Sequence, residues 1–197
     1  MERMGVRLAI RQAQARAGDV TLVYADESEA LTHPYLAHVW AEKGADLRVQ
    51  APGQSRKMAM MGALDAATRE LLVHTSPTKV SADFIGLLEL LDWRHGPKPG
   101  CPRRPVVLVL DNGPVHTSRV SLAALAARPW ITVEWLPAYA PELNDIERTW
   151  RDLKRHHLAH KTFKTAGDLE CAIRAAVKTL NQERQMTHPC ENQKRAA

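Results

Sequence analysis

A short apolar run that ends in a carboxylate, Pro105-Val-Val-Leu-Val-Leu-Asp-Asn-Gly-Pro-Val-His116, gives the first indication of the fold. The five residues from Val106 to Leu110 predict a strand that is buried on both faces and therefore lies inside a sheet. Asn112-Gly113 predicts a sharp turn directly after it. Asp111 is thus expected at the carboxyl end of a central strand, where open α/β sheets place their ligands.

A second predicted strand has the same design. Thr21-Leu-Val-Tyr-Ala-Asp26 is mostly apolar and is expected to end in two carboxylates, Asp26 and Glu27. An isolated Asp111 would more often open an Asx-turn than bind a ligand. Two adjacent parallel strands that end in aspartate would bring two carboxylates together. Their like charges repel, so both are ionised at low energetic cost only when a cation lies between them. A hard divalent metal ion is the usual cation.

A third carboxylate belongs to a predicted helix over residues 143–154. Its apolar face consists of Ile146, Trp150, Leu153 and His157. Glu147 lies on the flank of this face and leads a row of cations, Arg151 and Lys154. Asn144 and Glu147 also fit a capping box, in which Glu147 would satisfy the backbone at the start of the helix and do no chemistry. On the helix alone, the capping box is the simpler interpretation.

The remaining elements complete an α/β pattern without internal repeats. Helices are predicted over 1–18, 81–93, 117–127 and 166–180, and strands over 39–40, 47–50, 58–64, 70–75 and 130–135. The strands 58–64 and 70–75 should form an antiparallel hairpin. Ser81 is expected to cap its helix. Val120 is among the residues expected to be buried by helix 117–127, and helix 1–18 is expected to lack a full packing partner.

Length and charge limit the domain organisation and the kind of partner. We expect 197 residues to hold one core, with a linker helix over 1–19, a main domain over 20–181 and a frayed tail over 182–197. The formal charge is +5, and residues 148–164 carry six Lys or Arg against one acid. This patch favours a polyanion as partner, although most charge clusters are only solvated faces. Residues 94–105 are expected to form an exposed basic loop.

The cysteines and the apolar segments indicate the compartment. The three cysteines are odd in number and lack Cys-x-x-Cys spacing, so neither a disulfide framework nor a thiolate zinc site is predicted. Apolar runs stay shorter than the roughly 20 residues that span a bilayer. The first residues lack the apolar core of a signal peptide. The expected location is therefore a reducing cytoplasm.

Three sequence blocks resemble the mariner-type DDE transposases and their bacterial insertion-sequence relatives. The blocks are Tyr24-Ala-Asp-Glu-Ser28, Val109-Leu-Asp-Asn-Gly-Pro-Val-His116 and Leu136-Pro-Ala-Tyr-Ala-Pro-Glu-Leu-Asn-Asp-Ile-Glu-Arg-Thr-Trp150, followed by Leu153-Lys154. The resemblance extends from about residue 20 to residue 180. Asp145 departs from it, because the family commonly has proline there, and either residue is tolerated in the first turn of a helix.

The resemblance implies a fold, an activity and a set of functional residues. The fold would be ribonuclease H-like, with a mixed sheet of about five strands flanked by helices. Two Mg²⁺ (or Mn²⁺) ions would be held by Asp26, Asp111 and Glu147 for phosphodiester cleavage and strand transfer at transposon ends. The expected DNA-binding residues are His116, Arg151, Lys154, Arg155, Lys161 and Lys164. For His116, a hydrogen bond to the start of a helix is an equally good interpretation.

The resemblance also bears on partners. Double-stranded DNA, as transposon ends and as target, is the expected substrate. Relatives usually carry a helix-turn-helix region before the catalytic domain, and only six residues precede Arg7 here. We therefore expect a catalytic domain without this region, with a separately encoded helix-turn-helix protein and a second copy of the chain as candidate partners.

Two other functions are compatible with parts of the pattern. A catalytically silent remnant would only bind DNA through the basic patch, but all three carboxylates are intact. A phosphatase-like doubly wound fold with Asp26 as nucleophile would require a second aspartate two residues later, where Ser28 stands. Both observations favour the metal-dependent transposase.

Overall fold

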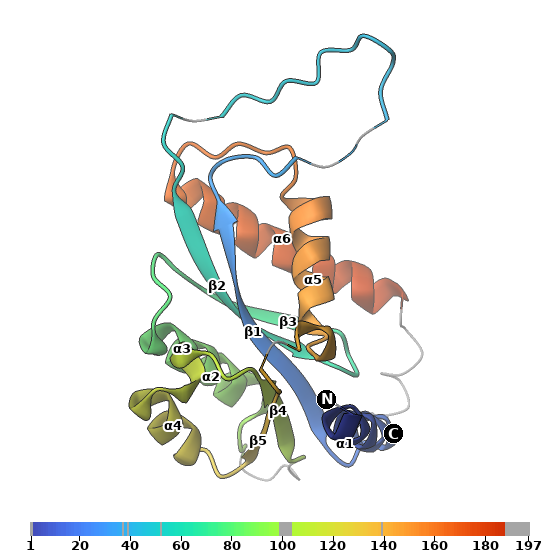
Figure 1. Ribbon diagram of the computed structural model, residues 1–197, viewed down its shortest axis with the longest axis vertical. Helices are drawn as coiled ribbons and strands as arrows, with labels where there is room; N and C mark the ends of the chain where they lie inside the picture. The colour runs from blue at the N-terminus through green and yellow to red at the C-terminus, as the bar shows by residue number, and fades with distance from the viewer. Residues whose placement is uncertain are drawn as a thin grey trace.

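The computed structural model describes residues 2–36, 38, 40–51, 53–98, 104–138 and 140–187 (Figure 1). The helices are α1 (Glu2–Ala17), α2 (Ser81–His95), α3 (Pro114–Thr117), α4 (Arg119–Ala126), η1 (Pro141–Leu143), α5 (Ile146–Asp152), η2 (Leu153–His157) and α6 (Ala166–Thr187). The strands are β1 (Thr21–Leu31), β2 (Lys57–Asp65), β3 (Leu71–Ser76), β4 (Val106–Leu110) and β5 (Ile131–Trp135).

The strands form one mixed sheet in the order β3-β2-β1-β4-β5. β1, β4 and β5 are parallel to one another, while β2 pairs antiparallel with both β1 and β3. The predicted hairpin and the predicted central strand 106–110 are therefore confirmed. A mixed sheet of five strands flanked by helices also confirms the ribonuclease H-like arrangement that the resemblance implies.

The sheet separates two cores, and the central strand contributes to both. Val107 and Val109 of β4 pack into the core beneath α1, α5 and α6. Val106, Leu108 and Leu110 pack into the opposite core, beneath α2 and α4. All five side chains are buried, as expected for a strand covered on both faces.

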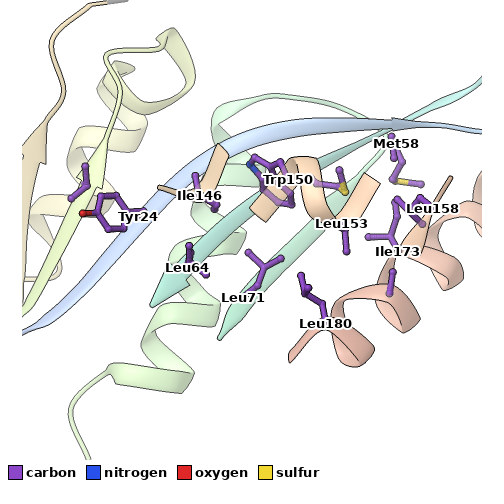
Figure 2. Close-up of a cluster of buried hydrophobic side chains, with 14 of the residues drawn as sticks. Tyr24, Met58, Leu64, Leu71, Ile146, Trp150, Leu153, Leu158, Ile173 and Leu180 are labelled. Carbon is purple, nitrogen blue, oxygen red and sulfur yellow. The ribbon is translucent and has the colours of Figure 1, made fainter. Parts of the chain in front are cut away.

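Helix α5 approaches the sheet closely because of one glycine. The indole of Trp150 lies over β2 in the core shown in Figure 2. A Cβ atom at Gly62 would overlap this ring. Gly62 is also the cross-strand partner of Asp26 on β1. The missing side chain at Gly62 therefore lets α5 pack directly beside Asp26.

Helix α1 has a packing partner, contrary to the expectation for residues 1–18. Its side chains Leu8 and Ala15 are buried in the core that contains β1 and β4. Arg7 and Arg11 both form ion pairs with Glu134 of β5, and the Arg11–Glu134 distance is 2.8 Å. Because Glu134 is almost fully buried, these arginines compensate a carboxylate that would otherwise be costly.

Strand β1 is longer than predicted. It continues past Asp26 to Leu31, because residues 23–31 pair with β2 while the parallel ladder with β4 ends at Tyr24. The strand predicted at 47–50 is wrong, since these residues have no ladder partner and lie in a long connection. The strand predicted at 39–40 includes Val39, which lies outside the described residues. Figure 1 shows this connection extending away from the sheet.

Several helix boundaries also differ from the predictions. Val80, not Ser81, precedes α2, and its amide donates to the Asp83 carboxylate. The helix predicted over 117–127 begins at Pro114 and breaks at Ser118, whose hydroxyl accepts from the Ser121 amide. Val120 is exposed rather than buried. Helix α6 continues to Thr187, so the tail predicted as frayed is helical over 182–187, and residues 188–197 lie outside the described residues.

Candidate active site

A pocket of about 490 Å³ opens at the end of β4, and all three predicted carboxylates line it. Asp26 comes from β1, Asp111 follows β4, and Glu147 comes from the first turn of α5. The rest of the lining consists of Asn112, Gly113, Pro114, Leu136, Pro137, Ala138, Ala140, Pro141 and Asn144. Three elements that are distant in sequence thus supply one acidic site.

Asp26 is placed by the alternation of β1. Leu22, Tyr24 and Ala30 belong to the core beneath α5, so Asp26 lies on the same face of the strand. Its Oδ1 accepts a hydrogen bond of 2.8 Å from the amide of Glu27. Burial raises the pKa of Asp26 to about 7, and the negative charges of Glu147, Glu27 and Asp111 add to this increase.

Asp111 lies in a different electrostatic environment. Its Oδ1 accepts from the amide of Gly113 at 3.0 Å and from Nδ1 of His116 at 2.6 Å. The hydrogen bond from His116 holds the pKa of Asp111 below its usual range. The contact with Gly113 is the Asx-turn that the sequence left open, so Asp111 both shapes the turn and lines the pocket.

Glu147 faces the pocket rather than capping its helix. No side chain of the described residues caps α5 through a hydrogen bond. Asn144, the other member of the expected capping box, is buried and donates from Nδ2 to the carbonyl of Ala25 at 3.2 Å. The capping-box alternative is therefore wrong, and Asn144 instead ties the start of α5 to the backbone beside Asp26.

His116 does not occupy the position expected of a DNA-binding residue. Its side chain is 1% exposed, because it packs edge-on against the ring of Phe84 at a centroid distance of 4.8 Å. Its Nε2 lies 3.4 Å from Oε2 of Glu27, and Lys79 pairs with Oε1 of the same glutamate at 3.1 Å. Since His116 cannot reach a phosphate from this position, its predicted DNA contact is wrong.

The predicted basic patch lies along the helix that carries Glu147 and the segment after it. Arg151, Arg155, Lys161 and Lys164 are exposed. Lys154 is half-buried, with Nζ 5.8 Å from the centre of the Tyr35 ring. Burial lowers the pKa of Lys154, whereas the negative charges of Glu147 and Glu29 act in the opposite direction. Lys154 is therefore electrostatically coupled to Glu147, and the other four face solvent.

The donor set of the pocket suits a hard divalent cation. Asp26, Asp111 and Glu147 offer only carboxylate oxygens, the ligands that Mg²⁺ and Mn²⁺ prefer. The raised pKa of Asp26 reflects burial and repulsion between these carboxylates, which a bound cation would relieve. Glu27, Asp111 and His116 also bring ligand atoms within 4.8 Å of one another. In that group, the two ring nitrogens of His116 face different carboxylates. This arrangement fits a hydrogen-bonded histidine better than one that coordinates the same metal ion as the two carboxylates.

Three polar residues at the site have contacts that the sequence did not predict. Asn112 donates from Nδ2 to the carbonyl of Leu136 at 2.6 Å and so fixes the loop after β4. Asn144 and Glu27 make the contacts described above. Asn112 and Glu27 are next to a predicted carboxylate, and Asn144 is three residues from one. The sequence could not predict their contacts, because the partner residues are distant in sequence and only the fold brings each pair together.

Comparisons with known proteins agree with this arrangement. A family model described as DDE superfamily endonuclease matches residues 21–170. An uncharacterized 39 kDa protein of the insertion element IS630 from Shigella sonnei is 32% identical over 130 residues, which are 66% of this chain. The chain spans 36% of that relative's length.

Solved structures share the fold at low sequence identity. A pre-cleavage Mos1 transpososome is 17% identical with a TM-score of 0.59, covering 94% of this chain and 60% of that chain. The Mos1 mariner paired end complex with Mn is 18% identical with a TM-score of 0.57 and the same coverage. The catalytic core domain of HTLV-2 integrase in complex with magnesium is 17% identical with a TM-score of 0.51, covering 82% and 86%.

The likeness to these structures shows the fold alone. The family model goes further, because it covers most of the chain, including β1, β4 and α5 with the three carboxylates that they bring to the pocket. This chain therefore belongs to the family of DDE superfamily endonucleases.

Proposed function

We propose that this chain is the catalytic domain of a transposase that cleaves and joins phosphodiester bonds in DNA. The observation that carries the proposal is the convergence of Asp26, Asp111 and Glu147 on one pocket, from β1, β4 and α5. The resemblance of the sequence blocks and the IS630 relative support DNA as the class of substrate. Transposon ends and target DNA are the proposed substrates.

The three carboxylates are proposed to hold two Mg²⁺ or Mn²⁺ ions. Bound metal ions would activate the attacking oxygen and stabilise the leaving oxygen in an in-line displacement. The chain itself provides the geometry for this role. Asn144 donates a hydrogen bond to the backbone beside Asp26, and Asn112 donates one to the carbonyl of Leu136. These hydrogen bonds hold the segments that carry the carboxylates in place.

The exposed cations near Glu147 are proposed to contact the DNA backbone. Arg151, Arg155, Lys161 and Lys164 offer positive charge outside the pocket, where they would position phosphates without reading bases. A second copy of the chain and a separately encoded helix-turn-helix protein stay predictions from the sequence resemblance. Among the described residues, no helix is long and apolar enough to cross a membrane.

A plasmid nicking assay tests the proposed activity. Supercoiled plasmid that carries the element's terminal repeats should be nicked in Mg²⁺ or Mn²⁺ and not in EDTA. Asp26→Asn, Asp111→Asn and Glu147→Gln should each lower the rate by about 100-fold or more, since each removes a charged ligand. Asp152→Asn is a matched control, because Asp152 is an exposed carboxylate on α5 that does not line the pocket.

Two outcomes would contradict the proposal. Nicking that persists at the unmodified rate in all three pocket variants would place the chemistry elsewhere. DNA binding by the unmodified chain with no nicking in either metal would identify the silent DNA-binding remnant instead.

A further inference from the structure

The two aspartates of the pocket are each held through one oxygen atom only. Asp26 accepts the Glu27 amide on Oδ1, and Asp111 accepts both of its hydrogen bonds on Oδ1. Among the described residues, no hydrogen bond reaches Oδ2 of either aspartate. The Oδ2 atoms therefore keep all their lone pairs for a cation.

A single residue, Glu27, connects the two anchored oxygens. Its amide donates to Asp26, and its side chain lies on the opposite face of β1, where Oε2 is 3.4 Å from Nε2 of His116. His116 in turn binds Asp111 through Nδ1 at 2.6 Å. The path from one aspartate to the other thus runs through one strand residue and one buried ring.

The buried part of this path contains two polar atoms that face each other. Nε2 of His116 and Oε2 of Glu27 are both buried, and neither makes a hydrogen bond, although they lie 3.4 Å apart. The two ring nitrogens of His116 therefore face two different carboxylates, Asp111 on one side and Glu27 on the other. Lys79, 3.1 Å from Oε1, holds the far oxygen of Glu27.

We propose that Glu27 and His116 are positioning residues that fix Oδ1 of Asp26 and Asp111, so that each aspartate binds metal through Oδ2. The proposal rests on the proposed function, because it assumes that these aspartates are the metal ligands. Partners of this kind orient metal-binding carboxylates, and their loss usually lowers metal affinity by about 10- to 100-fold.

The test is Mn²⁺ affinity, measured by calorimetry on the full chain, together with the thermal midpoint in EDTA. His116→Phe keeps a ring against Phe84 and removes both nitrogens, so it should weaken Mn²⁺ binding about 10- to 100-fold. His116→Asn can donate from the position of Nδ1 and should restore affinity to within about threefold of the unmodified chain. The side chain of His116→Gln reaches toward Glu27 instead of Asp111, so this variant should not restore Mn²⁺ affinity. His95→Phe, on α2 away from the pocket, is the matched control.

Each outcome has a defined meaning. If His116→Phe and His116→Asn lower the thermal midpoint but leave Mn²⁺ affinity unchanged, His116 is only structural and the proposal is overturned. If His116→Asn is as defective as His116→Phe, a donor at the position of Nδ1 does not support metal affinity, which also overturns the proposal. Asp111→Asn distinguishes failure of the proposed function from failure of the positioning role. Unchanged Mn²⁺ affinity in that variant would refute the proposed function rather than the role of His116.

Discussion

Asp26 and Asp111 line the same pocket but differ in their affinity for a proton. Burial raises the pKa of Asp26 to about 7, whereas the hydrogen bond from His116 lowers the pKa of Asp111. Near neutral pH without metal, Asp26 is therefore partly protonated and Asp111 is ionised. A divalent cation would favour the ionised form of both, so metal binding below pH 7 should release a proton from Asp26.

The stability of the metal-free protein should reveal this difference. The pKa of Asp26 is about 7 when folded and near 3.8 when unfolded, so the folded state binds the extra proton and loses stability as pH rises between these values. Asp26→Asn removes this loss. In EDTA the variant should match the unmodified chain near pH 4 and exceed its free energy of unfolding by up to about 4 kcal/mol at pH 8.

Urea unfolding at both pH values measures the effect. Asp152→Asn, an exposed control on α5, should show no such dependence on pH. With saturating Mn²⁺ the order should reverse, because only the unmodified chain gains binding energy from the metal. A constant difference between Asp26→Asn and the unmodified chain across this range would show that Asp26 has an ordinary pKa.

Individual site residues were predictable where a short pattern placed them. Asp111 follows a strand of five apolar residues, which predicts a central position in the sheet. Glu147 lies beside the apolar face of an amphipathic helix. The contacts of Glu27 and His116 were not predictable, because they depend on which face of β1 meets the loop after β4. His116 was accordingly predicted to contact DNA and instead lies inside the protein.

Helix α5 carries Glu147, and its distance from the sheet depends on Gly62. A Cβ at this position would overlap the Trp150 indole, which lies one turn after Glu147 and is buried in the core drawn in Figure 2. The neighbouring Ile146 side chain is also close, at 3.3 Å from the same position. Both contacts restrict how far α5 can shift along β2.

Gly62→Ala should therefore destabilise the fold by about 1 to 3 kcal/mol, as overpacking of a tight core does. Trp150→Leu in the same chain should recover part of this loss, because the smaller side chain leaves room for the new methyl group. Nicking by Gly62→Ala should fall, since a displaced α5 moves Glu147. Additive effects of the two changes on urea unfolding would show that Trp150 does not set the position of the helix.

Gly167→Ala provides the matched glycine control. Its Cβ would meet only the Thr165 hydroxyl at 3.6 Å, an ordinary contact at the start of α6. Stability should stay within about 0.5 kcal/mol of the unmodified chain, because a surface change away from packing has little effect.

Regular elements were predicted where local sequence and tertiary pairing agree. The hairpin of β2 and β3 and the strand β4 show this agreement. β1 was predicted to stop at its acidic residues, but pairing with β2 carries it through Glu27 and Glu29, and Lys57 forms an ion pair with Glu29 across the ladder. The π-helical turn from Leu153 to His157 could not be predicted from a constant 100° rotation.

Four exposed cations follow Glu147 in the chain, on its helix and in the segment after it. Arg151 and Arg155 follow Glu147 along one continuous helical segment, while Lys161 and Lys164 extend the charge toward α6. Contacts between such cations and phosphates release counterions, which makes DNA binding weaker as salt increases. Lys154 contributes less to this surface, because it is half-buried near Tyr35.

Arg151→Ala combined with Arg155→Ala should reduce the slope of log K against log salt by up to about 1.8, which corresponds to two phosphate contacts. Titration of labelled duplex DNA at several salt concentrations measures the slope. Arg174→Ala with Lys178→Ala removes the same charge from exposed positions on α6 and should leave the slope unchanged. Equal slopes for both double variants would show that the patch beside Glu147 is only a solvated face.

The assignment of the metal ligands can be tested most directly by anomalous diffraction. A crystal of the chain soaked in Mn²⁺ should show two peaks, about 3.5 to 4 Å apart, bounded by the carboxylates of Asp26, Asp111 and Glu147. Mn²⁺ bound between Glu27 and His116, or an empty pocket with Glu147 turned away from both aspartates, would contradict the assignment.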